Sequence, residues 1–278
     1  MSCQLLSRFA FGCALTIIAA AASAADTNPL NDRFSINLGA YFMSSDTDIR
    51  VDDADGLDLG TNIDLEDTFG FDDESVFRLE GAWRFFPRHK LRLMYFASNR
   101  RSHDELEEDI DFNGTTFPVA AEVNAKFDFD IIELAYEYEF LHRDNLELGV
   151  SIGIHNVGVK MALDASISAG GAGASGSLHE DVDTDAPLPV VGLRGTWRMG
   201  GNFYLQAHAQ YFQLKFDAYD GSLQDYQAGV LWQFTPHFGV GAAYNLFDTT
   251  VKVDDGGHFI GRLDWAYDGA QVYVRAAF

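Results

Sequence analysis

The chain ends in the stretch Gly269 to Phe278, which reads GAQVYVRAAF. Two sets of residues alternate along it, Val272, Val274, Ala276 and Phe278 on one face and Gln271, Tyr273 and Arg275 on the other. A period of two with unlike faces predicts a β-strand. The strand runs to the last residue, with no turn or tail after it. A terminal strand that is also fully paired suits a closed sheet, in which the last strand pairs with the first.

Nine earlier stretches show the same alternation, so the sequence predicts about ten strands. Tight turns follow residues 86, 141, 199 and 234, and longer or more acidic connections follow residues 44, 101, 163, 217 and 252. Segregation of short and long connections to opposite sides is typical of transmembrane barrels. A soluble sandwich would not require it. We therefore predict an all-β fold: one antiparallel transmembrane β-barrel with short periplasmic turns and long acidic extracellular loops.

Several local features are expected within this barrel. Phe127, Phe129 and Ile131 have the opposite phase to the apolar residues after them, which predicts a bulge near Ile132. A phase change is also expected at Gly269. Long loops are expected over 45–74, 102–124 and 164–186, the last of them flexible because it is rich in Gly, Ala and Ser. Aromatic girdles are expected at both membrane interfaces, formed by Trp83, Phe85, Tyr138, Phe140, Trp197 and Trp232 near the turns and by Trp265 and Tyr267 towards the loops.

Residues 1–25 are expected to be a cleaved signal peptide, which leaves 26–278 as the barrel domain. Arg8 supplies the positive start, and an apolar stretch leads to a small-residue cleavage motif at Ala24. Both cysteines of the chain lie in this segment, so the mature protein would have no thiol. Removal of residues 1–25 changes the net charge from −23 to −24, because this segment contains one cation and no acidic residue. Such a charge disfavours binding to nucleic acid.

The final six residues, Tyr273-Val274-Arg275-Ala276-Ala277-Phe278, resemble the C-terminal signal of Gram-negative outer-membrane barrels, which typically end on an aromatic residue after alternating apolar residues. The similarity is to small barrels in the style of the outer membrane protein A barrel domain and of porin-like proteins. It implies an outer-membrane location and contact with lipid and lipopolysaccharide. It also implies insertion by the barrel-assembly machinery, with Tyr273 and Phe278 as the assembly signal. It transfers no functional residues and no oligomeric state.

The inward face of the predicted barrel supplies the first candidate site, a lumen charge network. Its members are Arg78, Glu80, Arg84, Arg92, Glu133, Glu137, Glu139, Arg194, Arg198, His208, Asp225 and Arg275. Buried charges require hydrogen-bonded partners of opposite sign. Two interpretations remain open. The side chains either fill the interior and fix the strand register, or they line a narrow hydrated path.

The acidic connections supply the second candidate site, for a hard cation such as Ca²⁺ or Mg²⁺ bound through oxygen ligands. The candidate ligands are Asp52, Asp53, Asp55, Asp58, Asp181, Asp183 and Asp185. Neither run has the pattern of an EF-hand loop. A solvated acidic surface is the alternative. No other cofactor is expected.

Histidines next to acidic residues, as in His103-Asp104, His179-Glu180 and His258 near Asp254, are the groups that a lipid A or peptide hydrolase at the rim would use. No second set of residues completes a triad, so we expect the protein not to be an enzyme. A porin-like or structural role is the expected function. Surface recognition or adhesion through the loops is the main alternative.

Overall fold

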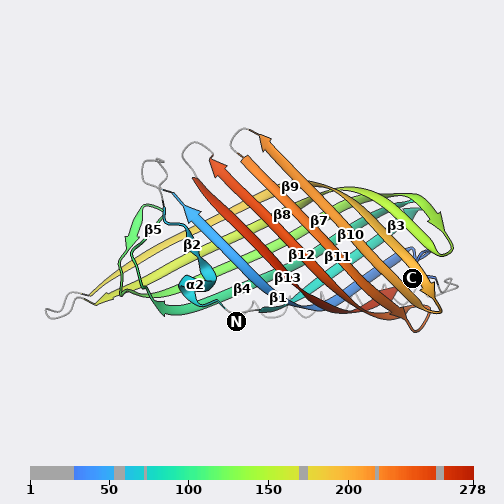
Figure 1. The fold of residues 1–278 in the computed structure, drawn as a ribbon, viewed down its shortest axis with the longest axis horizontal. Helices are drawn as coiled ribbons and strands as arrows, with labels where there is room; N and C mark the ends of the chain where they lie inside the picture. Colours follow the sequence, from blue (N-terminus) through green and yellow to red (C-terminus); the bar gives the residue numbers. More distant parts are fainter. Residues whose placement is uncertain (1–27, 53–59, 72–73, 169–174, 217–218, 255–259) are drawn as a thin grey trace, which may run out of the picture.

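The computed structural model describes residues 28–52, 60–71, 74–168, 175–216, 219–254 and 260–278. Ten long antiparallel strands form a closed barrel (Figure 1), as the alternation predicts. They are β1 (Phe34–Val51), β3 (Glu74–Phe86), β4 (His89–Glu105), β7 (Glu122–Arg143), β8 (Leu146–Ser168), β9 (Ser175–Gly200), β10 (Phe203–Phe216), β11 (Tyr219–Gln233), β12 (Phe238–Asp254) and β13 (Ile260–Ala277). The shorter elements are β2 (Ile63–Asp64), α2 (Leu65–Phe69), β5 (Ile110–Phe112) and β6 (Thr115–Phe117). No helix among the described residues is long and apolar enough to cross a membrane.

The predicted closure between the last strand and the first is confirmed. β13 pairs with β1 without interruption from Ala277 opposite Ser35 to Gly261 opposite Val51. The carbonyl of Phe278 then accepts hydrogen bonds from the backbone N–H groups of Arg33 (2.9 Å) and Phe34 (2.8 Å). The end of the chain therefore completes the ring, and the ten-strand wall has no edge at this seam.

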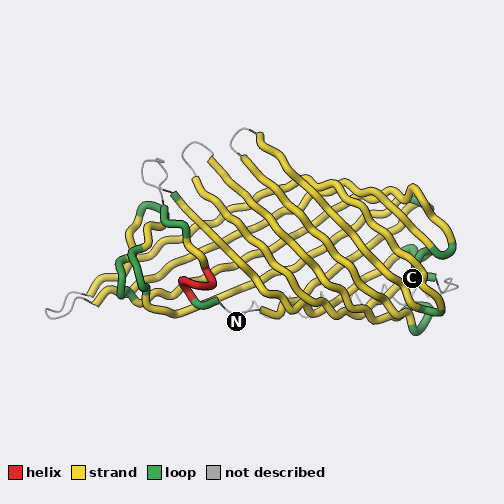
Figure 2. The backbone as a smooth tube through the Cα atoms, in the orientation of Figure 1, coloured by secondary structure: helices red, strands yellow, loops and turns green. Residues whose placement is uncertain are grey.

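The two ends of the barrel differ. At one end, here the turn end, two to four residues connect successive strands after positions 86, 143, 200 and 233, and Phe278 lies nearby (Figure 1). At the other end, here the loop end, lie α2, β2 and the β5–β6 hairpin (Figure 2). This is the segregation of connections that the spacing of the alternating stretches predicts.

The outward face of the long strands, β3 excepted, changes from apolar to polar towards the loop end. On β7, Ile132, Leu134, Tyr136, Tyr138 and Phe140 face outward and are 36–51% exposed. They span about the nine to eleven residues that a tilted strand needs to cross the hydrocarbon core. Closer to the loop end, the outward positions of β7 carry Asp130, Asp128 and Lys126. We call the polar-faced part of the barrel the loop-end extension. On the other strands, β3 excepted, the first polar outward residues are Ser44, Asn99, Asn156, Asp185, Gln213, Gln224, Asp248 and Asp268.

The inward face changes from polar to apolar at the height where the outward face changes from apolar to polar. Below it, β7 points Glu133, Glu137 and Glu139 inward, and above it the strand points Phe127, Phe129 and Ile131 inward. The alternation itself is unbroken, and the register with β4 is regular throughout. The predicted bulge near Ile132 is therefore wrong. The surroundings change from lipid to water, so the same strand phase puts apolar residues outside in one half and inside in the other.

The phase change expected at Gly269 is wrong for the same reason. β13 keeps one register with both neighbours along its whole length. Trp265 and Tyr267 consequently point inward and are 2% and 3% exposed. They belong to the interior of the extension and not to a membrane girdle. Trp83, Phe140, Trp197 and Trp232 are outward and 46–49% exposed near the turn end, as a girdle requires.

The connections at the loop end are shorter than expected, because the strands continue into them. In the stretch 164–186, expected as a flexible loop, all described residues are strand, since β8 and β9 pair up to Ser168 opposite Ser175; residues 169–174 lie outside the described part. β1 likewise continues to Val51. β4 and β7 pair as far as Glu105 opposite Glu122. The extension is thus folded sheet that presents carboxylates on its outer face.

An apolar core fills the extension. Ring contacts link Trp265 to Phe129, with centroids 3.8 Å apart, and to Tyr267 at 4.6 Å. Phe247 stacks on Tyr267 at 4.7 Å, and Phe96 lies 6.2 Å from Trp265. Inward side chains from the other strands, from α2 and from the β5–β6 hairpin complete the cluster. The interior at this end is packed as in a water-soluble domain.

Helix α2 closes a gap in the wall of the extension. β1 pairs with β3 only as far as Met43 opposite Glu74, while both β1 and β4 continue beyond. The α2 residue Glu66 fits between them. Its carboxylate accepts hydrogen bonds from Thr47 N (2.8 Å) and Thr47 Oγ1 (3.0 Å), and it pairs with Arg100 of β4. The gap in the wall between β1 and β4 is therefore filled by α2.

The segment before β1 closes the turn end. Leu30 is 1% exposed and packs with Tyr204, Leu231 and Tyr273 inside the barrel. Asn28 Nδ2 donates a hydrogen bond to the Asp144 carbonyl (2.9 Å). The barrel is therefore filled at both ends, by this short lead and by the apolar core.

Candidate functional site

Between the two closed ends lies the polar interior of the barrel, where the structure places eleven of the twelve residues of the predicted lumen charge network. The twelfth, Arg198, lies at the turn end, where its Nε donates to the Gly201 carbonyl (3.1 Å) and its guanidinium covers the Tyr204 ring. Alternation brings the others inward from seven strands. It does not by itself say which of them meet.

At the turn-end side of this interior, two cations share two carboxylates. Arg84 pairs with Glu139 and with Glu147, the latter at 2.7 Å. Lys90 Nζ lies 2.7 Å from Glu139 Oε1 and also bonds Glu147. Glu139 and Glu147 are nearly fully buried, so the pairing compensates charges that water does not reach. We call these four residues the turn-end lattice.

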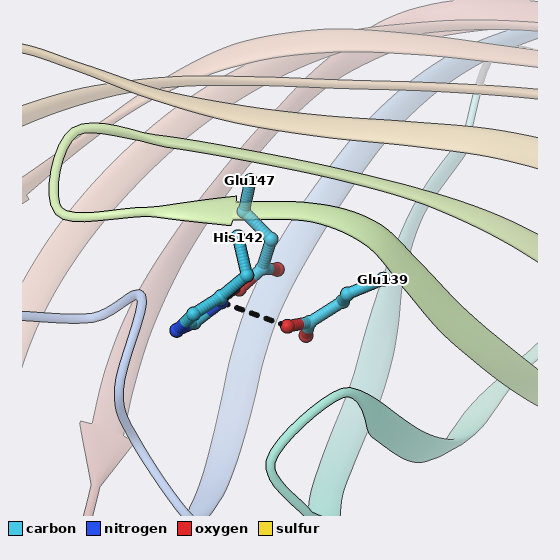
Figure 3. Close-up of side chains that lie close together, drawn as sticks. All are labelled: Glu139, His142 and Glu147. Atoms are coloured by element: carbon cyan, nitrogen blue, oxygen red, sulfur yellow. Dashed lines mark ion pairs between the residues drawn. The ribbon is translucent and has the colours of Figure 1, made fainter.

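His142 joins the turn-end lattice from the last residues of β7 (Figure 3). Its Nδ1 lies 2.9 Å from Glu139 Oε2 and 3.5 Å from Glu147 Oε2. These three residues are the one group in the described part of the chain whose possible metal-ligand atoms converge. Arg84 and Lys90 already occupy the same carboxylate oxygens. A metal ion would have to displace them, so the geometry favours a salt-bridge lattice.

Charged side chains are also paired in the middle of the interior. Arg92 Nε lies 2.5 Å from Glu137, which also faces Arg194 at 3.4 Å. On β3, Arg78 pairs with Glu80 at 2.8 Å. A cavity of about 60 Å³ lies among these groups, room for on the order of four water molecules. Near the turn end Arg275 pairs with Asp32 at 3.0 Å.

Two histidine–carboxylate pairs lie closest to the apolar core. His155 Nε2 is 3.2 Å from Glu133, which also accepts a hydrogen bond from Gln210 Nε2 (2.6 Å). His208 Nε2 is 3.3 Å from Asp225. His155 is fully buried. Each of these two pairs is thus built from residues far apart in sequence and held on separate strands.

Sequence reasoning missed Lys90, Glu147 and His155, although each lies on the inward phase of its strand. Glu147 alternates with Leu146 and Leu148, and His155 follows Ile154. Extending the alternation to every inward position would have found them. Their partners could not have been found this way, because these depend on how the strands face one another across the barrel.

The candidate cation ligands do not converge in the part of the chain that the structure describes. Asp181, Asp183 and Asp185 alternate on the outer face of β9, which separates successive carboxylates by about 7 Å along the strand. Asp183 pairs with Lys160 at 2.7 Å. Asp52 is 3% exposed, pairs with Arg50 and accepts a hydrogen bond from Gly60 N. Asp53, Asp55 and Asp58 lie outside the described residues.

The histidines considered for catalysis are exposed on the extension. His103 Nδ1 lies 2.9 Å from Asn124 Oδ1, and His179 Nδ1 lies 2.6 Å from Asp164 Oδ1. The hydrogen bond to Asp164, and then its charge, raise the pKa of His179. These are cross-strand pairs on neighbouring strands. His258 lies outside the described residues.

The two residues of the expected assembly signal occupy opposite faces of β13. Tyr273 points inward, and its Oη donates a hydrogen bond to Gln206 Oε1 (2.9 Å). A Cβ at Gly241 would lie 2.2 Å from the Tyr273 ring, so a side chain there would displace the ring from its present position. Phe278 stacks on His237 at the turn end, with centroids 5.3 Å apart.

Comparison with solved structures relates the chain to outer-membrane β-barrel proteins. The outer membrane protease OmpT of Escherichia coli aligns with a TM-score of 0.58 and 15% identity, over 89% of this chain and 97% of that chain. A FadL homologue of Pseudomonas aeruginosa aligns with a TM-score of 0.39 and 11% identity (90% and 92% covered), and the attachment invasion locus protein Ail of Yersinia pestis with 0.28 and 14% (88% and 99%). The OmpT likeness shows the fold alone. No protein-family model matches the chain, and no curated protein does.

Proposed function

We propose that the protein is a structural, non-conducting barrel of a Gram-negative outer membrane that holds the loop-end extension at the cell surface for recognition. One observation carries this proposal: among the described residues, side chains close the interior at both ends, and the polar middle between them holds a cavity of about 60 Å³. The N-terminal lead and the turn-end lattice fill one end, paired charges fill the middle, and the apolar core fills the extension. This supports the structural interpretation of the lumen charge network over the hydrated path.

The orientation follows from general features of such barrels. Short turns lie on the periplasmic side and longer connections on the outer side. We infer that residues 1–25 direct export, that the C-terminal strand with Tyr273 and Phe278 is read by the barrel-assembly machinery, and that the polar extension projects beyond the lipopolysaccharide headgroups. An outward face rich in aspartate suits this environment, where divalent cations bridge the lipid phosphates.

Refolded protein should carry no ion current in a planar lipid bilayer. Among the described residues the apolar core leaves no hydrated path through the extension, and a buried charge lattice does not open without losing its pairing. Conductance is recorded with a known porin in the same bilayer as the positive control. Reproducible voltage-independent channel steps from the protein would contradict the closed interior.

A cysteine placed at Asp183 should react with a membrane-impermeant maleimide on intact cells, and one at Arg143 should react only after the outer membrane is permeabilised. Asp183 is exposed on the extension and Arg143 is exposed at the turn end. The expected mature chain has no other cysteine to confuse the labelling. The reverse pattern would overturn the proposed orientation.

A further inference from the structure

The wall of the extension has a second interruption, between β9 and β10. In the described residues, pairing between these strands ends at Val191 opposite Tyr211. Beyond it β9 remains paired with β8 as far as Ser175, and β10 remains paired with β11 as far as Phe216. Figure 1 shows the β8–β9 and β10–β11 hairpins diverging towards the loop end. Each therefore presents a strand edge without a ladder partner, the arrangement to which a further strand can add.

This interruption is not filled as the first one is. Between β1 and β4, α2 occupies the gap and hydrogen-bonds both strands. Between β9 and β10, a groove of about 290 Å³ remains, close to the lower end of the roughly 300–1,000 Å³ typical of ligand pockets. The contrast marks the β9–β10 opening as a place for something outside the described chain.

The groove is apolar. Leu188 of β9, Phe212 and Leu214 of β10 and Val251 of β12 line it, and Leu214 is 47% exposed. Its two sides meet at the floor, where Leu188 Cδ2 lies 3.3 Å from the position that a Cβ on Gly221 would take. Apolar side chains from an added strand would enter here and be removed from water.

The outer face beside this edge is acidic. Asp181, Asp183 and Asp185 are exposed at alternate positions of β9, and the positions between them, Val182 and Thr184, point inward, as does Ala186. A strand added here would place one face against carboxylates and the other towards apolar side chains. A second copy of the same edge would bring like charges opposite one another, which is destabilising. A partner with positive charge on its outer face is complementary.

Two prolines limit where a strand can add. Pro187 and Pro189 lie within the β8–β9 ladder, and a proline fits such a position only when its nitrogen faces the open side. Near the membrane the edge therefore offers no N–H at these two positions. Residue 185 has the same phase, so its N–H faces the open side and is available to an added strand.

We propose that the edge of β9 and the adjoining groove bind an extended cationic polypeptide by strand addition, with Lys or Arg opposite the aspartates and apolar residues between them. This inference deepens the proposed recognition role and rests on it. It is independent of the conductance result, because a barrel with no ion current can still fail to bind such a segment.

A fluorescent peptide of about eight residues, a common strand length, with alternating Lys and Val should bind the refolded full-length protein, as measured by fluorescence anisotropy. Added salt should weaken the binding, because the charge pairs are exposed. A peptide with Glu in place of Lys should not bind. Methylating the backbone nitrogens on the side that faces β9 should weaken binding by at least about tenfold, which corresponds to roughly 1.4 kcal/mol.

A matched pair of variants separates backbone pairing from charge. D185N removes one carboxylate and keeps the N–H, so binding should fall by about two- to fivefold, as for one cross-strand charge pair. D185P removes both and should lower affinity at least about tenfold further. Equal affinity of the two variants, or equal affinity of the methylated and unmethylated peptides, would overturn strand addition. Binding of lauric acid with no binding of the Lys–Val peptide would assign the groove to an acyl chain and also overturn the proposal.

Discussion

Replacing Arg84 with methionine should lower the free energy of unfolding by about 3–5 kcal/mol, the range for removing one partner from a buried ion pair. Arg84 compensates Glu139 and Glu147 and also donates hydrogen bonds to the carbonyls of Leu30 (2.6 Å) and Pro87 (2.9 Å). Methionine removes all of these donors while the carboxylates stay buried. Urea unfolding of protein refolded in lipid vesicles, followed by circular dichroism, measures the change.

Two further variants make the Arg84 result specific. Arg143→Met makes the same substitution at the exposed last residue of β7 and should change the free energy of unfolding by about 0.5 kcal/mol or less. Adding Glu147→Gln to Arg84→Met should recover part of the loss, because it removes one uncompensated carboxylate. If Arg84→Met and Arg143→Met destabilise equally, the turn-end lattice does not hold this end of the barrel together.

Replacing Trp265 with alanine should cost about 3–5 kcal/mol, the range for truncating a large aromatic side chain in a packed core. Trp265 is 2% exposed and contacts Phe129, Phe247 and Tyr267 in the core of the extension. The cavity left behind would be lined by rings with no group to fill it. The same unfolding measurement applies.

The matched control is Trp232→Ala. Trp232 is 46% exposed on the outer face near the turn end. Its truncation removes fewer contacts within the protein, so the free energy of unfolding should fall clearly less than for Trp265→Ala. Trp265→Ala should also expose the extension to limited proteolysis, whereas Trp232→Ala should leave it resistant. Equal effects of the two substitutions would place Trp265 at the membrane interface, as the sequence alone predicts.

The faces of the membrane-spanning part were predictable because the signal is local. Alternation with period two assigns each residue to one side of its strand. Leu91, Val150, Leu193 and Val274 are outward and at least 36% exposed, while Arg78, Arg84 and Glu137 are buried inside. A few residues of sequence suffice for this assignment, which is why the ten strands and their closing pair were also found.

The faces of the extension were not predictable in the same way. Phe127, Phe129 and Trp265 are apolar, and the rule that places apolar residues against lipid assigns them outward. They lie inside because this part of the barrel stands beyond the apolar outer band. A residue's height along the barrel depends on the register of all the strands together, so it cannot be predicted from a short stretch of sequence.

The sequence alone determined that the chain is a closed β-barrel of about ten strands. It also determined which inward residues carry charge and where short turns connect the strands. Those properties depend on near neighbours in the chain. The tertiary structure decided which charges meet, that side chains close the interior at both ends, that α2 closes one interruption of the wall, and that β9 keeps an open edge among the described residues. These depend on contacts between residues as far apart as Arg84 and Glu147, and such contacts exist only once every strand has taken its register.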